Sequence, residues 1–413
     1  MITRFSLYGF LKNMQFFEPF LILYFLSMGL SYLQIGMLVS FRAICVNILE
    51  IPSGAAADIY GRKSAMLFSL GSYILSFIIF SLVSWYPLLF AAMFFFSIGE
   101  AFRTGTHKAM IFDWLRHNDR LDERTKVYGF TRSWSKIGSA VSVIIASGIV
   151  ILSNDYRWVF AVSIIPYCAG IWNMLCYPSS LNRRLDNGSI SIKNVALHLL
   201  KSLKHAFSNR GIRGLIIRST GFEGAFRVSR DYLQPIIRAQ AVALTACLAL
   251  SEKDGTAIII GLVYFILYMI SASASRRSWR FVALAKTEDR ASVMLLIMAA
   301  ATILTAAAGF LAGVYIVPIA AFIVLYLLQN LWRPILVSQF DLHAQSSEQA
   351  TILSIESQAK SIGIIVLAPA AGFIADIYGI HASLAMLSLV PVLVWALSRS
   401  APAALKKQDN GNH

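Results

Sequence analysis

The chain has 413 residues, of which 57% are hydrophobic and 14% are charged. An ordinary soluble domain carries about 25% charged residues, so this composition excludes that class. The formal net charge is +15, but the basic residues lie between long apolar runs, which argues against nucleic-acid binding. The runs are much longer than the roughly ten-residue strands of a membrane β-barrel and do not alternate strictly. They therefore predict membrane-spanning helices.

Twelve apolar runs predict twelve spanning helices, six on either side of a long polar connection. In chain order, the predicted spans are 8–30, 34–57, 64–83, 87–114, 129–151, 157–176, 212–236, 255–275, 290–312, 316–341, 351–375 and 380–398. The predicted domains are an N-terminal six-helix bundle (1–176), a cytoplasmic linker (177–210), a C-terminal six-helix bundle (211–400) and a cytoplasmic tail (401–413). Apolar residues recur with helical spacing over 191–207, which indicates either a basic amphipathic helix on the membrane or a solvated tether.

The basic residues predict how these spans are oriented. If the N-terminus is cytoplasmic, most of the basic residues between spans fall on the cytoplasmic side, and only Arg157, Arg238 and Lys253 fall on the other. We therefore expect an all-α membrane protein with both termini in the cytoplasm.

The frame Gly-x-x-x-Asp-Ile-Tyr-Gly occurs twice, at 54–61 and 372–379. The copies lie at the ends of predicted helices 2 and 11, and an odd number of helices separates them, so they face opposite sides. Inverted three-helix repeats within each half of a transporter produce this relation. Segments 136–148 and 360–372 are also similar and have the same orientation, which predicts that the two halves are parallel repeats.

With its basic ending, the stretch GAAADIYGRK (54–63) resembles the cytoplasmic signature of the major facilitator superfamily. Twelve spans in two sets of six extend the resemblance over essentially the whole chain. The stretches EIPSGAAAD, IFDWL and QATILSIES resemble small prokaryotic permeases in particular. The resemblance implies two six-helix bundles that alternate their access to the two sides of a bacterial cytoplasmic (inner) membrane.

The resemblance also implies a gating motif. Its residues are Gly54, Asp58, Gly61, Arg62 and Lys63, together with Asp113 at the end of predicted helix 4. The aspartate is expected to face the start of helix 11, where the helix dipole favours an anion, and Arg62 is expected to pair with Asp113. The glycines permit close helix approach and a tight turn. This cluster would hold the two halves together in the outward-open state. The alternative is a plain turn with charges that only set topology.

Charged side chains within the spans are the candidate site residues, because each costs about 2.5–3.5 kcal/mol at mid-bilayer unless it faces a cavity or a partner. By resemblance, helices 1, 4, 7 and 10 line the central cavity. The substrate-binding candidates are Arg42, Arg103, Arg227, Arg230, Asn330 and Arg333, and the proton-coupling candidates are Glu18, Glu100 and Glu223.

Among the arginines, Arg103 and Arg333 occupy equivalent mid-span positions in the two halves. We expect them to bracket an anionic group of the substrate, and we expect Arg103 to be the neighbour that keeps Glu100 ionised. A substrate anion that competes for the arginine would then release the carboxyl to bind a proton.

Other charges in the spans have more than one interpretation. Glu356 and Lys360 are four residues apart, which fits either a neutralised structural pair or a functional one. A separate set lies near predicted cytoplasmic ends and is expected to extend toward the membrane surface: Lys12, Arg132, Lys136 and Arg218.

The sequence thus predicts a monomeric secondary active transporter for a small organic solute, anionic or zwitterionic and coupled to protons. Multidrug efflux is the alternative, although the helix 5 stretch GSAVSVIIASG (138–148) lacks the proline of the antiporter subgroup. A non-transporting receptor or assembly factor with the same fold is a further alternative. The sequence predicts no enzymatic activity, cofactor, metal site or nucleic-acid partner.

Overall fold

The computed structural model describes residues 1–182, 210–248, 251–276, 278–343 and 349–399. The described residues form helices and no strand. The predicted amphipathic helix at 191–207 and the tail at 401–413 lie outside the described residues.

The helices of the first half are α1 (Ile2–Lys12), η1 (Glu18–Phe20), α2 (Leu21–Ser27), α3 (Tyr32–Tyr60), α4 (Arg62–Leu82), α5 (Tyr86–Arg103), α6 (Thr106–His117), η2 (Leu121–Glu123), α7 (Arg124–Ser153), α8 (Arg157–Leu175) and η3 (Ser179–Leu181). Those of the second half are α10 (Arg210–Asp231), α11 (Leu233–Leu248), α12 (Glu252–Arg276), α13 (Ser278–Ala285), α14 (Glu288–Leu311), α15 (Ile316–His343), α16 (Gln349–Tyr378) and α17 (Ile380–Arg399). We call α1–α8 the N-terminal group and α10–α17 the C-terminal group.

Ten helical segments of the described chain are long and apolar enough to cross a membrane, with α5 and α6 counting as one segment. The protein is therefore a multi-pass integral membrane protein. The predicted first span does not qualify because the helix is interrupted after Lys12 and resumes at Glu18. The predicted seventh span is divided between α10 and α11, and α10 carries seven charged residues of its own: Arg210, Arg213, Arg218, Glu223, Arg227, Arg230 and Asp231.

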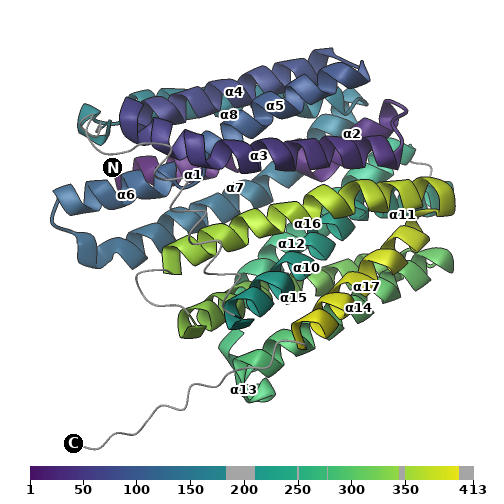
Figure 1. Ribbon diagram of the computed structural model, residues 1–413. Coiled ribbons are helices and arrows are strands. Elements are labelled where there is room, and N and C mark those ends of the chain that lie inside the picture. The colour runs from purple at the N-terminus through teal and green to yellow at the C-terminus, as the bar shows by residue number, and fades with distance from the viewer. Residues whose placement is uncertain (183–209, 249–250, 277, 344–348, 400–413) are drawn as a thin grey trace, which may run out of the picture.

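The two groups lie side by side (Figure 1). Within the N-terminal group, α4 packs on α5 and α8, and α1 packs on α7. Within the C-terminal group, α14 packs on α15 and α17, and α10 packs on α16. The groups meet mainly where α3 lies along α16 and where α7 lies along α12.

We call the end of the molecule with Arg62 and Asp113 the motif end, and the end with Tyr32 and Asp376 the opposite end. At the opposite end, the small residues of α3 and α16 allow close backbone packing. A Cβ atom at Gly36 would collide with the backbone of Ala368, and one at Gly372 would collide with the backbone of Tyr32. The two helices therefore approach closely there because both positions lack a side chain.

Polar contacts also join the groups at the opposite end. The Asp376 carboxylate accepts hydrogen bonds from the backbone N–H groups of Tyr32 (2.8 Å) and Leu33 (2.9 Å). These belong to the first turn of α3, where backbone N–H groups have no partner within the helix. Lys253 Nζ donates to the backbone oxygen of Asn154 at 2.8 Å, which ties α12 to the loop after α7. These contacts join the two groups at the opposite end.

Candidate functional site

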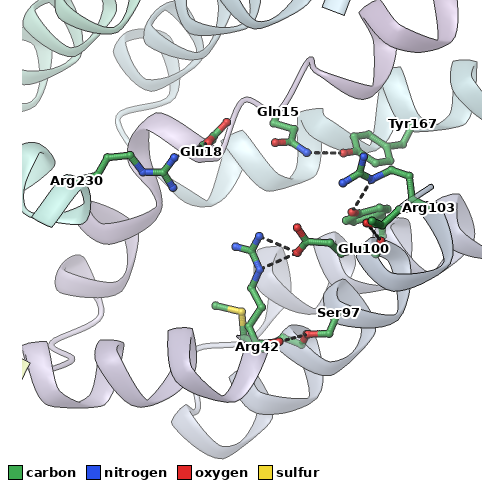
Figure 2. A network of polar contacts seen from close by, with 11 residues as sticks. Gln15, Glu18, Arg42, Ser97, Glu100, Arg103, Tyr167 and Arg230 are labelled. Atoms are coloured by element: carbon green, nitrogen blue, oxygen red, sulfur yellow. Dashed lines mark hydrogen bonds and ion pairs between the residues drawn. The ribbon is translucent and has the colours of Figure 1, made fainter. Parts of the chain in front are cut away.

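A charge pair between α3 and α5 forms the centre of the N-terminal group (Figure 2). Arg42 donates to one oxygen of Glu100 from Nε (3.1 Å) and Nη2 (2.8 Å). The Arg42 guanidinium also lies 4.4 Å from the centroid of the Phe96 ring, a cation–π arrangement. Glu100 is therefore held directly by Arg42, and not by Arg103 as we expected. Arg103 instead donates from Nε to the hydroxyl of Tyr73 at 3.3 Å.

A second pair connects the two groups. Glu18 begins the short helix η1, and its carboxylate lies 3.6 Å from Nη1 of Arg230 on α10. Gln234 on α11 reinforces this junction, because its amide donates to the Glu18 backbone oxygen at 3.0 Å and accepts from the Ile22 N–H at 2.8 Å. The Glu18 side chain is 38% exposed, so this carboxylate is accessible to a proton or a ligand.

The C-terminal group holds a buried carboxylate at Glu356, which is fully inaccessible. It accepts hydrogen bonds from Nη1 of Arg333 (2.9 and 3.0 Å) and from the hydroxyl of Ser219 (2.5 Å), and Lys360 Nζ lies 2.9 Å away. The Glu356–Lys360 pair thus forms, within a larger network. In this conformation Arg333 is already paired within its own group, so it does not face Arg103 across a shared anion.

The remaining candidates of the C-terminal group serve local contacts. Glu223 is buried, with Nε of the half-exposed Arg227 3.8 Å away. The side-chain amide of Asn330 donates to the Tyr326 backbone oxygen at 2.8 Å.

A cavity of about 350 Å³ lies in the N-terminal group, between α1, the end of α5, α6 and α7. Its basic lining residues are Lys12, Arg103, His107, Lys108, Arg132 and Lys136, and no aspartate or glutamate lines it. Lys12, Arg132 and Lys136, which we expected to extend toward the membrane surface, line this cavity between α1 and α7. Arg132 and Lys136 are also exposed. Arg218, the fourth residue of that set, pairs with Asp289 at 2.5 Å.

The cavity adjoins a break in a predicted span that sequence reasoning missed. The span expected at 87–114 divides after Arg103, because Thr104 is extended and Gly105 has φ +80° before α6 begins at Thr106. The sequence Thr-Gly-Thr at 104–106 could have predicted this break, because an isolated glycine between small polar residues favours a turn. Interrupted helices present free backbone groups at transporter binding sites.

At the motif end, Arg62 contacts Asp113 and lies 3.3 Å from Asp58, and Asp113 also receives Arg116 at 3.2 Å. Gly61 makes the expected tight turn, with φ +98°. The Arg62–Asp113 contact is the one that the family resemblance implies.

Two other expectations for the motif, whose cluster the resemblance implies for the outward-open state, are not met in this conformation. Asp58 pairs with Arg62 of its own group, and Lys63 Nζ donates to the backbone oxygens at the end of α8 (Leu175, 2.8 Å, and Tyr177, 2.7 Å). Among the described residues, no atom lies within 4 Å of a Cβ built on Gly54, so this glycine permits no close helix approach here. The physical reason is that the two groups are joined at the opposite end, where Asp376 caps α3.

Comparisons with known proteins agree with this architecture. A family model of the Major Facilitator Superfamily matches residues 6–357. YxaM of Bacillus subtilis (strain 168), an MFS-type transporter, is 25% identical over 399 residues, which cover 93% of this chain and 92% of YxaM.

Solved structures with the same fold include the nucleoside transporter NupG, with a TM-score of 0.78 and 12% identity over 97% of this chain and 98% of that one. They also include a POT family transporter in complex with 5-aminolevulinic acid, with a TM-score of 0.73 and 13% identity over 97% of this chain and 96% of that one. A D-xylose-proton symporter has a TM-score of 0.66 and 13% identity over 97% of each chain. At these identities the likeness shows the fold alone. Because the family model covers most of the chain, the protein belongs to the Major Facilitator Superfamily, whose members are transporters and not enzymes.

Proposed function

We propose that the protein is a proton-coupled secondary transporter of a small organic anion, working by alternating access in the bacterial cytoplasmic membrane. The observation that carries this proposal is the arrangement of charge: paired ions at the middle of the molecule, a basic cavity beside them, and two groups joined at one end. The asymmetry of basic residues supports a cytoplasmic position for the motif end, and with that orientation this conformation would be inward-facing. The two groups correspond to proposed domains at 1–176 and 211–400, joined by the 177–210 linker.

In the proposed mechanism, the central carboxylates carry the proton. Arg42 is paired with Glu100, and Arg230 lies near Glu18. A substrate anion that draws either arginine away leaves its carboxylate without a counterion, and that carboxylate then binds a proton. Substrate and proton are thereby taken up together, which is symport. One protein with the same fold is a D-xylose-proton symporter, and this is consistent with proton coupling.

In the proposed cycle, the gating residues Gly54, Asp58, Gly61, Arg62 and Lys63, with Asp113, close the motif end when the opposite end opens. The residues of this cluster that belong to the N-terminal group are already in contact through Arg62 and Asp113. Closure then requires only that α16 approach Asp58, since the N-terminal end of a helix attracts an anion.

The test is uptake by the purified protein in proteoliposomes. A panel of radiolabelled anions, zwitterions and lipophilic cations is offered with and without an inwardly directed proton gradient. We expect uptake of an anion that rises with the gradient and is absent from protein-free liposomes. Transport of lipophilic cations with no anion uptake would overturn the proposal in favour of multidrug efflux.

A further inference from the structure

The cations that line the basic cavity of the N-terminal group differ from those of the other charged sites in whether a carboxylate lies close enough to neutralise them. Arg42, Arg230 and Arg333 each lie within 4.0 Å of a carboxylate. Among the described residues, none of the five cationic side chains that line the cavity has such a partner: Lys12, Arg103, Lys108, Arg132 and Lys136. Arg103 and Lys12 are partly buried, whereas Lys108, Arg132 and Lys136 are exposed. Five like charges around one cavity repel one another, so their arrangement favours an anion between them.

The backbone at the break between α5 and α6 adds hydrogen-bond donors on the same side. Gly105, His107 and Lys108 line the cavity, at the first turn of the twelve-residue helix α6. The first N–H groups of a helix lack intrahelical partners, and together with the helix dipole they bind phosphate and carboxylate groups. No described atom lies within 4 Å of a Cβ built on Gly105, so ligand atoms have room to approach the backbone.

A buried hydroxyl without a partner is the second, independent observation. Tyr8 lines the cavity and is only 3% exposed, yet its hydroxyl has no hydrogen-bond partner among the described residues. A buried polar group normally has a partner. Tyr8 also lies against His107, with ring centroids 4.0 Å apart, so its ring is held in place beside the start of α6.

We propose that this cavity binds the anionic end of a solute that carries at least two negative charges, a phosphate monoester or a di- or tricarboxylate. The inference rests on the proposed function and specifies its substrate class. One negative charge would leave most of the cavity's positive charge uncompensated, whereas a multivalent anion can contact α6, Arg103 and the α7 cations together. Four polar side chains also line the cavity, and each already donates a hydrogen bond to a nearby backbone oxygen, so their oxygens can accept from donors of the solute: Asn13, Thr131, Ser135 and Ser139.

The first experiment measures binding at constant pH and ionic strength, with the protein in nanodiscs of phosphatidylcholine. The probes are glycerol 3-phosphate and citrate, with glycerol and butyrate as their controls. We expect both multivalent anions to raise the thermal unfolding midpoint and to give saturable binding by calorimetry, and we expect the controls to do neither. Equal binding of butyrate and citrate, or no binding of either multivalent anion, would overturn the inference.

Variants connect this binding to the cavity. Lys136→Ala and Arg132→Ala should each weaken binding of the better probe by about tenfold or more, because each removes a charge-assisted contact. Lys126→Ala is the matched control, since Lys126 is exposed on the same helix and does not line the cavity. Tyr8→Phe removes only the unpartnered hydroxyl and should weaken binding about threefold or more without lowering the unfolding midpoint. If Lys136→Ala and Lys126→Ala bind alike, the cavity is not the site.

A lipid phosphate has the same chemistry as a phosphorylated solute. Replacing a fifth of the phosphatidylcholine by phosphatidic acid distinguishes the two sources: unchanged affinity for the soluble probe supports the inference, and competitive loss assigns the cavity to a lipid. Proteoliposome transport separates the two proposals. If the wild type transports the anions and Lys136→Ala has an unchanged KM, the cavity inference fails and the proposed function stands. If the probes bind in the cavity and no anion is transported, the proposed function fails.

Discussion

At the scale of single residues, what each charged side chain can do depends on the group that it contacts. Arg42 and Glu100 are paired within the N-terminal group, whereas Arg103 next to them donates to a tyrosine hydroxyl and meets no carboxylate within 4.0 Å in the described part of the chain. Arg333 occupies the position equivalent to Arg103 in the other half but is bound to a fully buried carboxylate, Glu356. Equivalent positions therefore have different surroundings: in the proposed site Arg103 keeps donors for a ligand, whereas Arg333 is bound within its own group.

The contrast predicts opposite outcomes for two alanine substitutions. Arg333→Ala should destabilise the protein by about 1–3 kcal/mol, because it leaves the buried Glu356 with fewer counter-charges, although the exposure of Arg333 reduces the effect. Arg103→Ala should lower anion affinity and change stability by less. Thermal unfolding in detergent, together with binding of glycerol 3-phosphate, measures both quantities. A larger loss of stability for Arg103→Ala would contradict this assignment.

A second prediction at this scale concerns the proposed proton carrier. Glu100→Gln keeps the size of the side chain but mimics its protonated form, so proton-driven uptake should fall at least about tenfold. Counterflow exchange of substrate, which needs no net proton movement, should persist within about threefold, and its dependence on pH should weaken. Uptake assays with and without a proton gradient distinguish the two modes. Gradient-driven uptake at the wild-type rate would exclude Glu100 as the carrier.

At the scale of helices, the two copies of the repeated frame act at opposite ends. Asp376 of the second copy caps the first turn of α3 across the two groups, whereas Asp58 of the first copy is paired inside its own group. The inverted relation between the copies explains why the two aspartates lie at opposite ends of the molecule, where one bridges the groups and the other does not. In the basic pair that follows the first copy, Arg62 contacts Asp113, and Lys63 donates a hydrogen bond to a backbone oxygen at the end of α8.

We therefore predict that Asp376→Asn weakens closure at the opposite end. The loss of a carboxylate that accepts two backbone hydrogen bonds costs about 1–2 kcal/mol, which changes the ratio of the two conformations about five- to thirtyfold. A cysteine at Val39, which lines a small cavity near this end, should react faster with a maleimide in Asp376→Asn than in the parent. Asp58→Asn is the matched substitution at the motif end. It should slow transport strongly but leave labelling at Val39→Cys unchanged or slower, and equal acceleration by both would contradict the prediction.

At the scale of the whole molecule, the contacts that join the two groups at the opposite end, with Asp58 paired inside its own group at the motif end, fit the proposal that this is one state of an alternating cycle. The proposed cytoplasmic position of the motif end has a direct test in intact cells, because membrane-impermeant maleimides label only the outer surface. In a cysteine-free background, Lys253→Cys should be labelled in intact cells, and Lys126→Cys should be labelled only after the membrane is permeabilised. The reverse pattern would invert the proposed orientation and make this conformation outward-facing.

The sequence by itself determined the class of protein, most of the spans and the family. The length of an apolar run indicates a membrane crossing whatever the helix packs against. The frame at 54–61 with its basic pair is a local pattern, so it can be recognised from neighbouring residues alone. The Arg62–Asp113 contact could be anticipated only because the family resemblance supplied it. The tertiary structure decided which charges meet. Arg42 with Glu100, Arg230 with Glu18 and Arg333 with Glu356 are pairs between different helical segments. The partner of each charge depends on how its helix is rotated about its own axis, and packing such as that of Gly36 against Ala368 sets this rotation. Helical periodicity along one segment shows which residues share a face but not which helix that face meets.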